Sequence, residues 1–143
     1  MRVWILDTDH LTLLLQGNPT VVNKLAAKAQ GEVVITVVTA EEQIWGRLSV
    51  IRQASQASNA EKLVRAYLKF RLALDDLMRF TILDFTQEAY LEYQELRRQK
   101  IRVGTQDLRI AAIALSIDAT VVTRNQRDFN QVPGLRLEDW TIW

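Results

Sequence analysis

Four acidic residues of this sequence stand at the ends of expected strands or in the opening turns of expected helices. The expected strands are short apolar runs, and the first of them, Val3-Trp4-Ile5-Leu6, ends directly in a carboxylate. Carboxyl ends of parallel strands share one edge of a sheet, where open α/β sheets place their ligands. The acids expected at that edge are Asp7, Glu42, Asp107 and Asp128.

Carboxylates packed closely oppose one another's ionisation, and a divalent cation removes that penalty. Two such ions, roughly 3.5–4 Å apart, can activate water and stabilise the leaving oxygen of a phosphodiester. The chain has no cysteine and a single histidine, His10, so a thiolate nucleophile and a histidine-rich or thiolate zinc site are excluded. Carboxylate oxygens favour Mg²⁺ or Mn²⁺, and whether one or two ions bind stays open. We interpret His10 itself as a helix-surface or capping residue.

Each acid also has an ordinary structural explanation. Glu42 ends the pattern Thr39-x-x-Glu42, which is typical of a helix capping box. Asp107 would complement a helix dipole, Asp7 could be an N-cap, and Asp128 could bond turn amides. Their joint placement at element junctions favours a shared site over four separate structural roles.

The elements that would position the acids alternate between strand and helix, which predicts a parallel α/β sheet with helices on both faces. Helical periodicity and turn residues place the boundaries. We expect the strand order 3-2-1-4, with the fifth, short strand at the far edge. Expected strands cover 2–6, 33–38, 80–83, 120–123 and 135–137; expected helices cover 8–16, 20–30, 39–52, 60–79, 86–98 and 107–117. Residues 53–60 are expected to form a loop or a poorly packed helical junction, and residues 124–134 a loop.

Composition is that of an ordinary globular protein: 48% of residues are apolar and 24% are charged, so neither disorder nor a membrane span is expected. A length of 143 residues suits one domain, residues 1–143, with one core. No secretory pattern is evident at the N-terminus, and with no cysteines we expect a cytoplasmic protein. Glycine-rich nucleotide-binding motifs are absent from the sequence.

Four motifs in a fixed order resemble those of PIN-domain ribonucleases, specifically VapC-type toxins of type II toxin–antitoxin systems. The resemblance covers nearly the full length and implies a PIN-like three-layer α/β fold. The motifs are Ile5-Leu6-Asp7-Thr8, Ile35 to Glu42 followed by Gly46, Asp107-x-x-Ile110-Ala111-Ala112, and Val122-Thr123-Arg124-Asn125-x-x-Asp128-Phe129, with a similar ending at Pro133 to Trp140.

This resemblance implies that Asp7, Glu42, Asp107 and Asp128 bind Mg²⁺ or Mn²⁺ and carry catalysis. Glu42 is selected over Glu41 because the family's glutamate stands four residues before the glycine, here Gly46. Adjacent helical residues point about 100° apart, so only one of the two can face the site. The resemblance also assigns supporting roles to Thr8, Thr123 and Asn125, and either Asn125 or Asp128 could supply the fourth ligand.

The same family implies cleavage of RNA, usually structured RNA such as transfer RNA, a homodimer, and a VapB-like antitoxin that inserts a segment near the active site. A basic rim could attract phosphates, although a solvated helix end explains part of it equally well. Its candidates are Arg97, Arg98, Lys100, Arg102, Arg109, Arg124 and Arg127. Trp45, Trp140 and Trp143 could cover apolar surface or pack in the core.

Two other classes of function stay open at this point. A catalytically inactive PIN-like protein would bind nucleic acid or protein without cleaving, and loss of an acid would favour it, but no acid is missing. A metal-dependent phosphatase or phosphotransfer domain is suggested by Asp7-x-Asp9. The sequence lacks the small-residue and lysine motifs that such enzymes use, which counts against this class.

Overall fold

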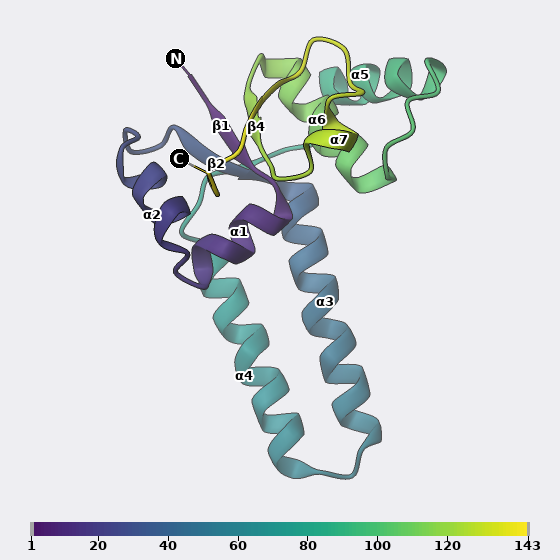
Figure 1. The fold of residues 1–143 in the computed structure, drawn as a ribbon. Coiled ribbons are helices and arrows are strands. Elements are labelled where there is room, and N and C mark those ends of the chain that lie inside the picture. Colours follow the sequence, from purple (N-terminus) through teal and green to yellow (C-terminus); the bar gives the residue numbers. More distant parts are fainter. Residues whose placement is uncertain (1, 143) are drawn as a thin grey trace.

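The computed structural model describes residues 2–142 and has a five-stranded parallel sheet at its centre (Figure 1). The strand order is β3-β2-β1-β4-β5, and every neighbouring pair is parallel. This confirms the predicted order, including the fifth strand at the far edge. The strands are β1 (Trp4–Leu6), β2 (Val33–Thr36), β3 (Ile82–Leu83), β4 (Thr120–Val122) and β5 (Arg136–Glu138).

Helices cover both faces of the sheet, as the alternating pattern predicted. Their bounds are α1 (Thr8–Leu15), α2 (Pro19–Ala26), α3 (Val37–Gln56), α4 (Ala60–Leu77), α5 (Gln87–Arg98), α6 (Thr105–Ile117) and α7 (Gln126–Phe129). None of the helices in residues 2–142 combines the length and the apolar character needed to cross a bilayer.

Alternation along β1 divides the core into two clusters. Ile5 packs into the cluster that contains buried side chains of α5 and α6. Trp4 and Leu6 pack on the opposite face, with Leu11 of α1 and Val21 of α2. Successive strand residues point to opposite faces, so a strand of three residues is enough to join the two helical layers. The predicted three-layer fold is therefore confirmed.

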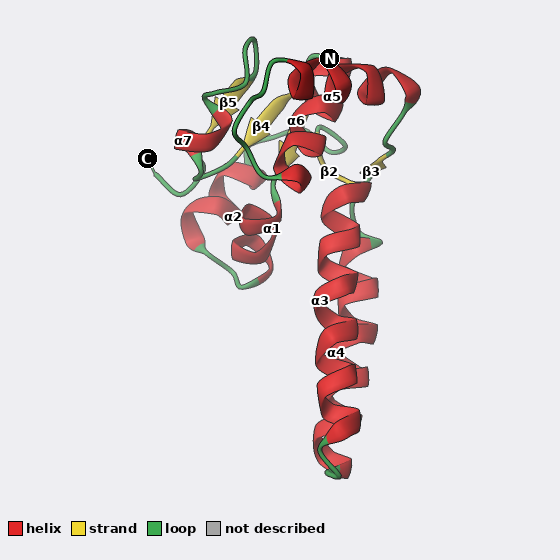
Figure 2. Ribbon diagram, turned by 90° about the vertical axis from the view of Figure 1, so that its right-hand side faces the viewer, coloured by secondary structure: helices red, strands yellow, loops and turns green. Residues whose placement is uncertain are grey.

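The antiparallel pair α3 and α4 forms a long hairpin that extends away from the sheet (Figure 2). Beyond the sheet, each of these helices has only the other to cover its apolar face. Large apolar side chains of the hairpin therefore lie partly in solvent: Leu48, Val64, Tyr67, Leu68 and Leu72 are exposed. Tyr90 of α5 is exposed as well.

The three tryptophans singled out in the sequence have different outcomes. Trp45 lies on the hairpin with 64% of its surface exposed. Trp140 is buried in the core beside Trp4. Trp143 lies outside the described residues.

Helix α3 begins two residues earlier than predicted, and the predicted capping box is wrong. Its N-cap is Thr36, whose Oγ1 accepts a hydrogen bond from the backbone N–H of Thr39 at 3.2 Å. The β-branched run misled the prediction because the chain leaves the sheet at Thr36, so Val37 is already helical. Glu42 therefore lies in the second turn of α3, free of a capping role.

Other boundaries also differ from the expectations. The second helix ends at Ala26 and not at residue 30, and α3 continues to Gln56 through the polar segment expected to form a loop or a poorly packed helical junction. Inside the loop expected at 124–134, residues Gln126–Phe129 form the single turn α7, anchored by the fully buried ring of Phe129.

Candidate active site

Asp7 follows β1 directly and is 6% exposed. Its backbone N–H donates to the Val122 carbonyl at the end of β4. Its Oδ1 accepts the backbone N–H of His10 at 2.8 Å, which makes Asp7 the N-cap of α1. The capping role proposed as an alternative is thus present, and it leaves Asp7 at the carboxyl edge of the sheet.

A pocket of about 440 Å³ opens at this edge of the sheet. Asp7 and Asp107 both line it, although 100 positions separate them in the sequence, because β1 ends where α6 begins. Asp107 lies in the first turn of α6, as predicted. The lining residues are Asp7, Thr8, Asp9, Thr12, Asp107, Arg124 and Asn125.

Glu42 joins this pocket through Thr8. The Thr8 hydroxyl donates to Glu42 Oε1 at 2.9 Å and lies 3.2 Å from the hydroxyl of Thr39. Glu41 is exposed, and its Oε1 accepts instead from Gln106 Nε2 at 2.9 Å. Of the two adjacent glutamates, Glu42 is therefore the one bonded to a pocket residue.

Asp128 joins the pocket through Asn125. Asn125 Nδ2 donates to Asp128 Oδ2 at 3.0 Å, and its backbone N–H donates to Thr123 Oγ1 at 2.9 Å. Thr123 is fully buried just after β4, so it fixes the start of this turn. Asn125 lines the pocket, whereas Asp128 lies on α7 and reaches the pocket only through its hydrogen bond to Asn125.

The four acids share one electrostatic environment. Burial, and after it the negative charges of Asp7, Glu42 and Asp128, together raise the pKa of Asp107 from 3.8 to about 6. A carboxyl whose pKa is raised by desolvation and like charges is a common feature of functional sites.

The donor chemistry of this cluster fits a hard divalent cation, because all four side chains offer carboxylate oxygens and their mutual repulsion favours a positive ion. Within residues 2–142, however, no three acidic or histidine side chains already lie close enough together to form a ready metal site.

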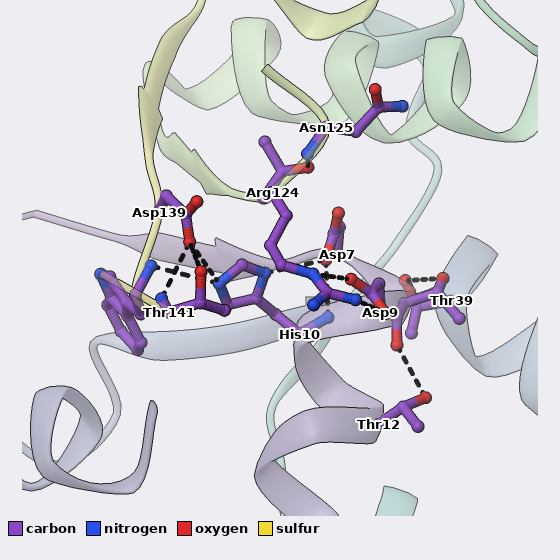
Figure 3. A network of polar contacts seen from close by, with 12 residues as sticks. Asp7, Asp9, His10, Thr12, Thr39, Arg124, Asn125, Asp139 and Thr141 are labelled. Atoms are coloured by element: carbon purple, nitrogen blue, oxygen red, sulfur yellow. Dashed lines mark hydrogen bonds and ion pairs between the residues drawn. The ribbon is translucent and has the colours of Figure 1, made fainter. Parts of the chain in front are cut away.

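Two polar contacts at the site were missed by the sequence reasoning. His10 is 0% exposed and accepts the backbone N–H of Trp140, so the predicted surface position is wrong. Arg124 forms a two-pronged ion pair with Asp9, at 2.7 and 3.1 Å (Figure 3). Both contacts join residues more than a hundred positions apart, and no local pattern in the sequence signals them.

The remaining basic candidates lie on surfaces near α5 and α6. The guanidinium groups of Arg97 and Arg109 lie 5.7 and 5.5 Å from the ring centroid of Tyr93. Arg98 is ion-paired with Glu95 on α5. The others are exposed: Lys100 and Arg102 on the turn that leads into α6, and Arg127 on α7.

Comparisons with known proteins agree with one another. The family model described as PIN domain matches residues 5–135. The tRNA(fMet)-specific endonuclease VapC of Shigella flexneri is 29% identical over 145 residues, covering 99% of this chain and 100% of that protein. The protein of the same name from Salmonella typhimurium is 26% identical over 144 residues, covering 98% and 99%. A solved structure, the DNA-bound VapBC of Salmonella typhimurium, superimposes with a TM-score of 0.74 at 26% identity, covering 98% of this chain and 99% of that chain.

Proposed function

The chain belongs to the PIN domain family, and from that premise we propose that it is an endoribonuclease toxin that a cognate antitoxin neutralises. Support comes from relatives that match almost end to end and are named as ribonucleases or tRNA-specific endonucleases. It also comes from the toxin–antitoxin complex that shares the fold. The observation that carries the proposal is that four acids from separate elements share one site, where burial and the charges of the other three acids raise the pKa of Asp107 to about 6.

Asp7, Glu42 and Asp107 would hold Mg²⁺ or Mn²⁺, with Asp128 or Asn125 completing the set. Such an ion, when bound, supplies an activated water and stabilises the leaving oxygen of a phosphodiester. The fit rests on the oxygen-only donor set and on the repulsion that a cation relieves.

The chain's own residues prepare this site before any ion binds. The N-cap bond from His10 fixes the rotamer of Asp7, and the Thr8 hydroxyl holds Glu42 at the pocket side of α3. Asn125 restrains Asp128 through a direct hydrogen bond. Each acid thus has a polar neighbour that limits its motion, except Asp107, whose carboxyl makes no side-chain hydrogen bond among the described residues.

RNA would approach over the basic residues around this pocket, because their positive charges offset the repulsion between the phosphates and the acids. Arg124 is nearest, because it lines the pocket. The wider rim would comprise Arg97, Arg98, Lys100, Arg102, Arg109 and Arg127, and transfer RNA is the substrate class that the relatives' names favour.

A VapB-like antitoxin would block the pocket, with an arginine or lysine among the acids. The reason is electrostatic, since mutually repelling carboxylates bind a cationic side chain strongly. We also expect a homodimer of this single PIN domain acting in the cytoplasm, where its RNA substrate would be; sedimentation of the purified chain tests the dimer.

A catalytically inactive PIN-like binding module is the second candidate, and it would need no metal ion at these acids. Calorimetric titration with Mn²⁺ separates the two candidates, because the nuclease needs the ion and the binding module does not.

RNA-end sequencing after brief expression tests the proposed activity directly. Wild-type protein should produce new RNA ends at discrete positions, whereas Asp7→Asn should not, although asparagine preserves the cap of α1. Asp118→Asn is a matched control: Asp118 is exposed at the opposite end of α6 in a left-handed conformation that asparagine tolerates.

The control variant should cut like wild type. Co-expression with a cognate antitoxin should abolish the new ends. Identical RNA ends from wild type and Asp7→Asn would refute the nuclease proposal.

A further inference from the structure

His10 is the only imidazole of the chain, and it is fully buried between two aspartates (Figure 3). Its Nδ1 lies 3.4 Å from Asp7 Oδ1, and its Nε2 lies 3.6 Å from Asp139 Oδ1. The Nε2 atom also accepts the backbone N–H of Trp140 at 3.2 Å. One ring therefore connects the candidate active site with the segment that follows β5.

The Trp140 contact determines where the ring carries its proton. A nitrogen that accepts a hydrogen bond must offer its lone pair, so a neutral ring that accepts at Nε2 carries its proton on Nδ1. A proton on Nε2 would instead point at the Trp140 N–H and set two donors against each other. The contact therefore selects the Nδ1-protonated form of His10.

Asp139 does not favour the opposite form of the ring, in which Nε2 carries the proton. Its Oδ1 already accepts two hydrogen bonds from Thr141, from the backbone N–H at 2.8 Å and from the hydroxyl at 2.6 Å. These bonds hold the turn after β5 in the position that aims the Trp140 N–H at the ring. Asp139 thus stabilises the backbone turn and leaves Nε2 to the Trp140 backbone.

On the other side of the ring, Nδ1 faces the carboxylate of Asp7. Buried Nδ1 makes no standard hydrogen bond among the described residues, and Asp7 Oδ1 lies 3.4 Å from it. That same oxygen accepts the His10 backbone N–H at 2.8 Å. The ring and the backbone of His10 therefore direct two donors at Oδ1, and no hydrogen bond within residues 2–142 involves the other oxygen, Oδ2.

We propose that His10 is a positioning residue for Asp7. The backbone of Trp140 selects the Nδ1-protonated form of the ring. In this form Nδ1–H is directed at Asp7 Oδ1, which leaves Oδ2 for the ion in the pocket. The part that concerns the ion rests on the proposed function. Residues that orient a metal ligand in this way typically change metal affinity or activity by roughly 10–100-fold when replaced.

The position of the proton can be measured without any activity. Protein labelled with ¹⁵N-histidine gives a single imidazole in its ¹⁵N–¹H spectra, because the chain has one histidine. We expect a protonated Nδ1 and an unprotonated Nε2 in the metal-free wild-type protein. A ring protonated only at Nε2 would overturn the proposal, whether or not the protein cleaves RNA.

Two variants separate orientation of Asp7 from packing of the ring. In His10→Asn the amide is attached to Cγ, where Nδ1 is attached, so it can still donate toward Asp7. In His10→Gln the amide reaches the Nε2 position, so it can accept from Trp140 but loses the donor to Asp7. Both variants remove the ring, and each keeps one of its two polar contacts.

Mn²⁺ titration by calorimetry of wild type and both variants completes the test. We expect His10→Gln to bind Mn²⁺ roughly 10-fold more weakly than wild type, and His10→Asn to stay within about threefold. Equal losses in the two variants, or a larger loss in His10→Asn, would overturn the positioning role. If wild type binds no Mn²⁺, the proposed function fails, whereas the imidazole spectrum still decides whether His10 directs its proton at Asp7.

Discussion

Replacing Asp107 by asparagine should stabilise the metal-free protein at pH 8. The change keeps the shape of the side chain and removes one negative charge from the acid cluster. A pKa raised from 3.8 to about 6 corresponds to about 3 kcal/mol at full strength. Asp107 is partly exposed, so screening reduces this to roughly 1–2 kcal/mol, and loss of a favourable charge in the first turn of α6 subtracts about 0.5 kcal/mol. The expected net gain is about 1 kcal/mol.

The pH dependence of this gain has a definite sign. The pKa of Asp107 is higher in the folded protein than in the unfolded chain, so between about pH 4 and pH 6 the folded state keeps a proton that the unfolded chain has lost. Wild-type stability should therefore decrease as the pH rises through this window and level off above it. The advantage of Asp107→Asn should be present at pH 8 and absent at about pH 4.

Thermal and urea unfolding in the presence of a chelator measure this difference. A gain of about 1 kcal/mol raises the melting temperature by about 3 °C in a protein of this size. Adding Mg²⁺ or Mn²⁺ should reverse the order, because wild type gains RT ln(1 + [L]/Kd), about 2.7 kcal/mol at a hundredfold excess over Kd, and the variant gains less.

Glu88→Gln is the matched control, since Glu88 is an exposed acid in the first turn of α5. It should lose a few tenths of a kcal/mol at pH 8 and show no metal effect. Destabilisation of Asp107→Asn in chelator, with a difference from wild type that does not vary with pH, would refute the idea that repulsion dominates at this carboxyl.

Other substitutions test separate parts of the site. Glu42→Gln should lower RNA cleavage by roughly 100-fold, equivalent to about 2.7 kcal/mol of transition-state stabilisation, while Glu41→Gln should cut like wild type; equal rates in a cleavage assay would contradict the assignment of Glu42. Asp9→Asn removes the partner of Arg124, so RNA binding by a metal-free sample should tighten and its log–log salt slope should steepen by about one; an unchanged slope would show that Arg124 does not contact phosphate. Thr36→Ala removes the N-cap of α3 and should cost about 1–2 kcal/mol in urea unfolding, and a loss below about 0.3 kcal/mol would mean that backbone pairing alone fixes this helix start.

Much of the fold could be predicted from local patterns in the sequence. Short β-branched runs separated by amphipathic segments are sufficient to predict parallel strands with helical crossovers, because only buried strands are apolar on both faces. Asp7 and Asp107 could be placed at one edge for the same reason, since β1 ends and α6 begins there. The ends of the strands were harder to predict. Val37 and Val38 favour a strand because they are β-branched, whereas the Thr36 side chain caps the start of a helix.

What only the tertiary structure decided depends on contacts between distant residues. His10 follows a polar stretch and would suit a surface, but the segment after β5 folds over it and buries it. Arg124 seemed free to meet RNA, yet it pairs with Asp9, 115 positions away. Trp45 suits a core by its chemistry and lies in solvent, because α3 extends past the sheet that would have covered it. Local sequence specifies which residues can form an element. The packing of elements against one another determines which side chains stay exposed to solvent and which contact another residue.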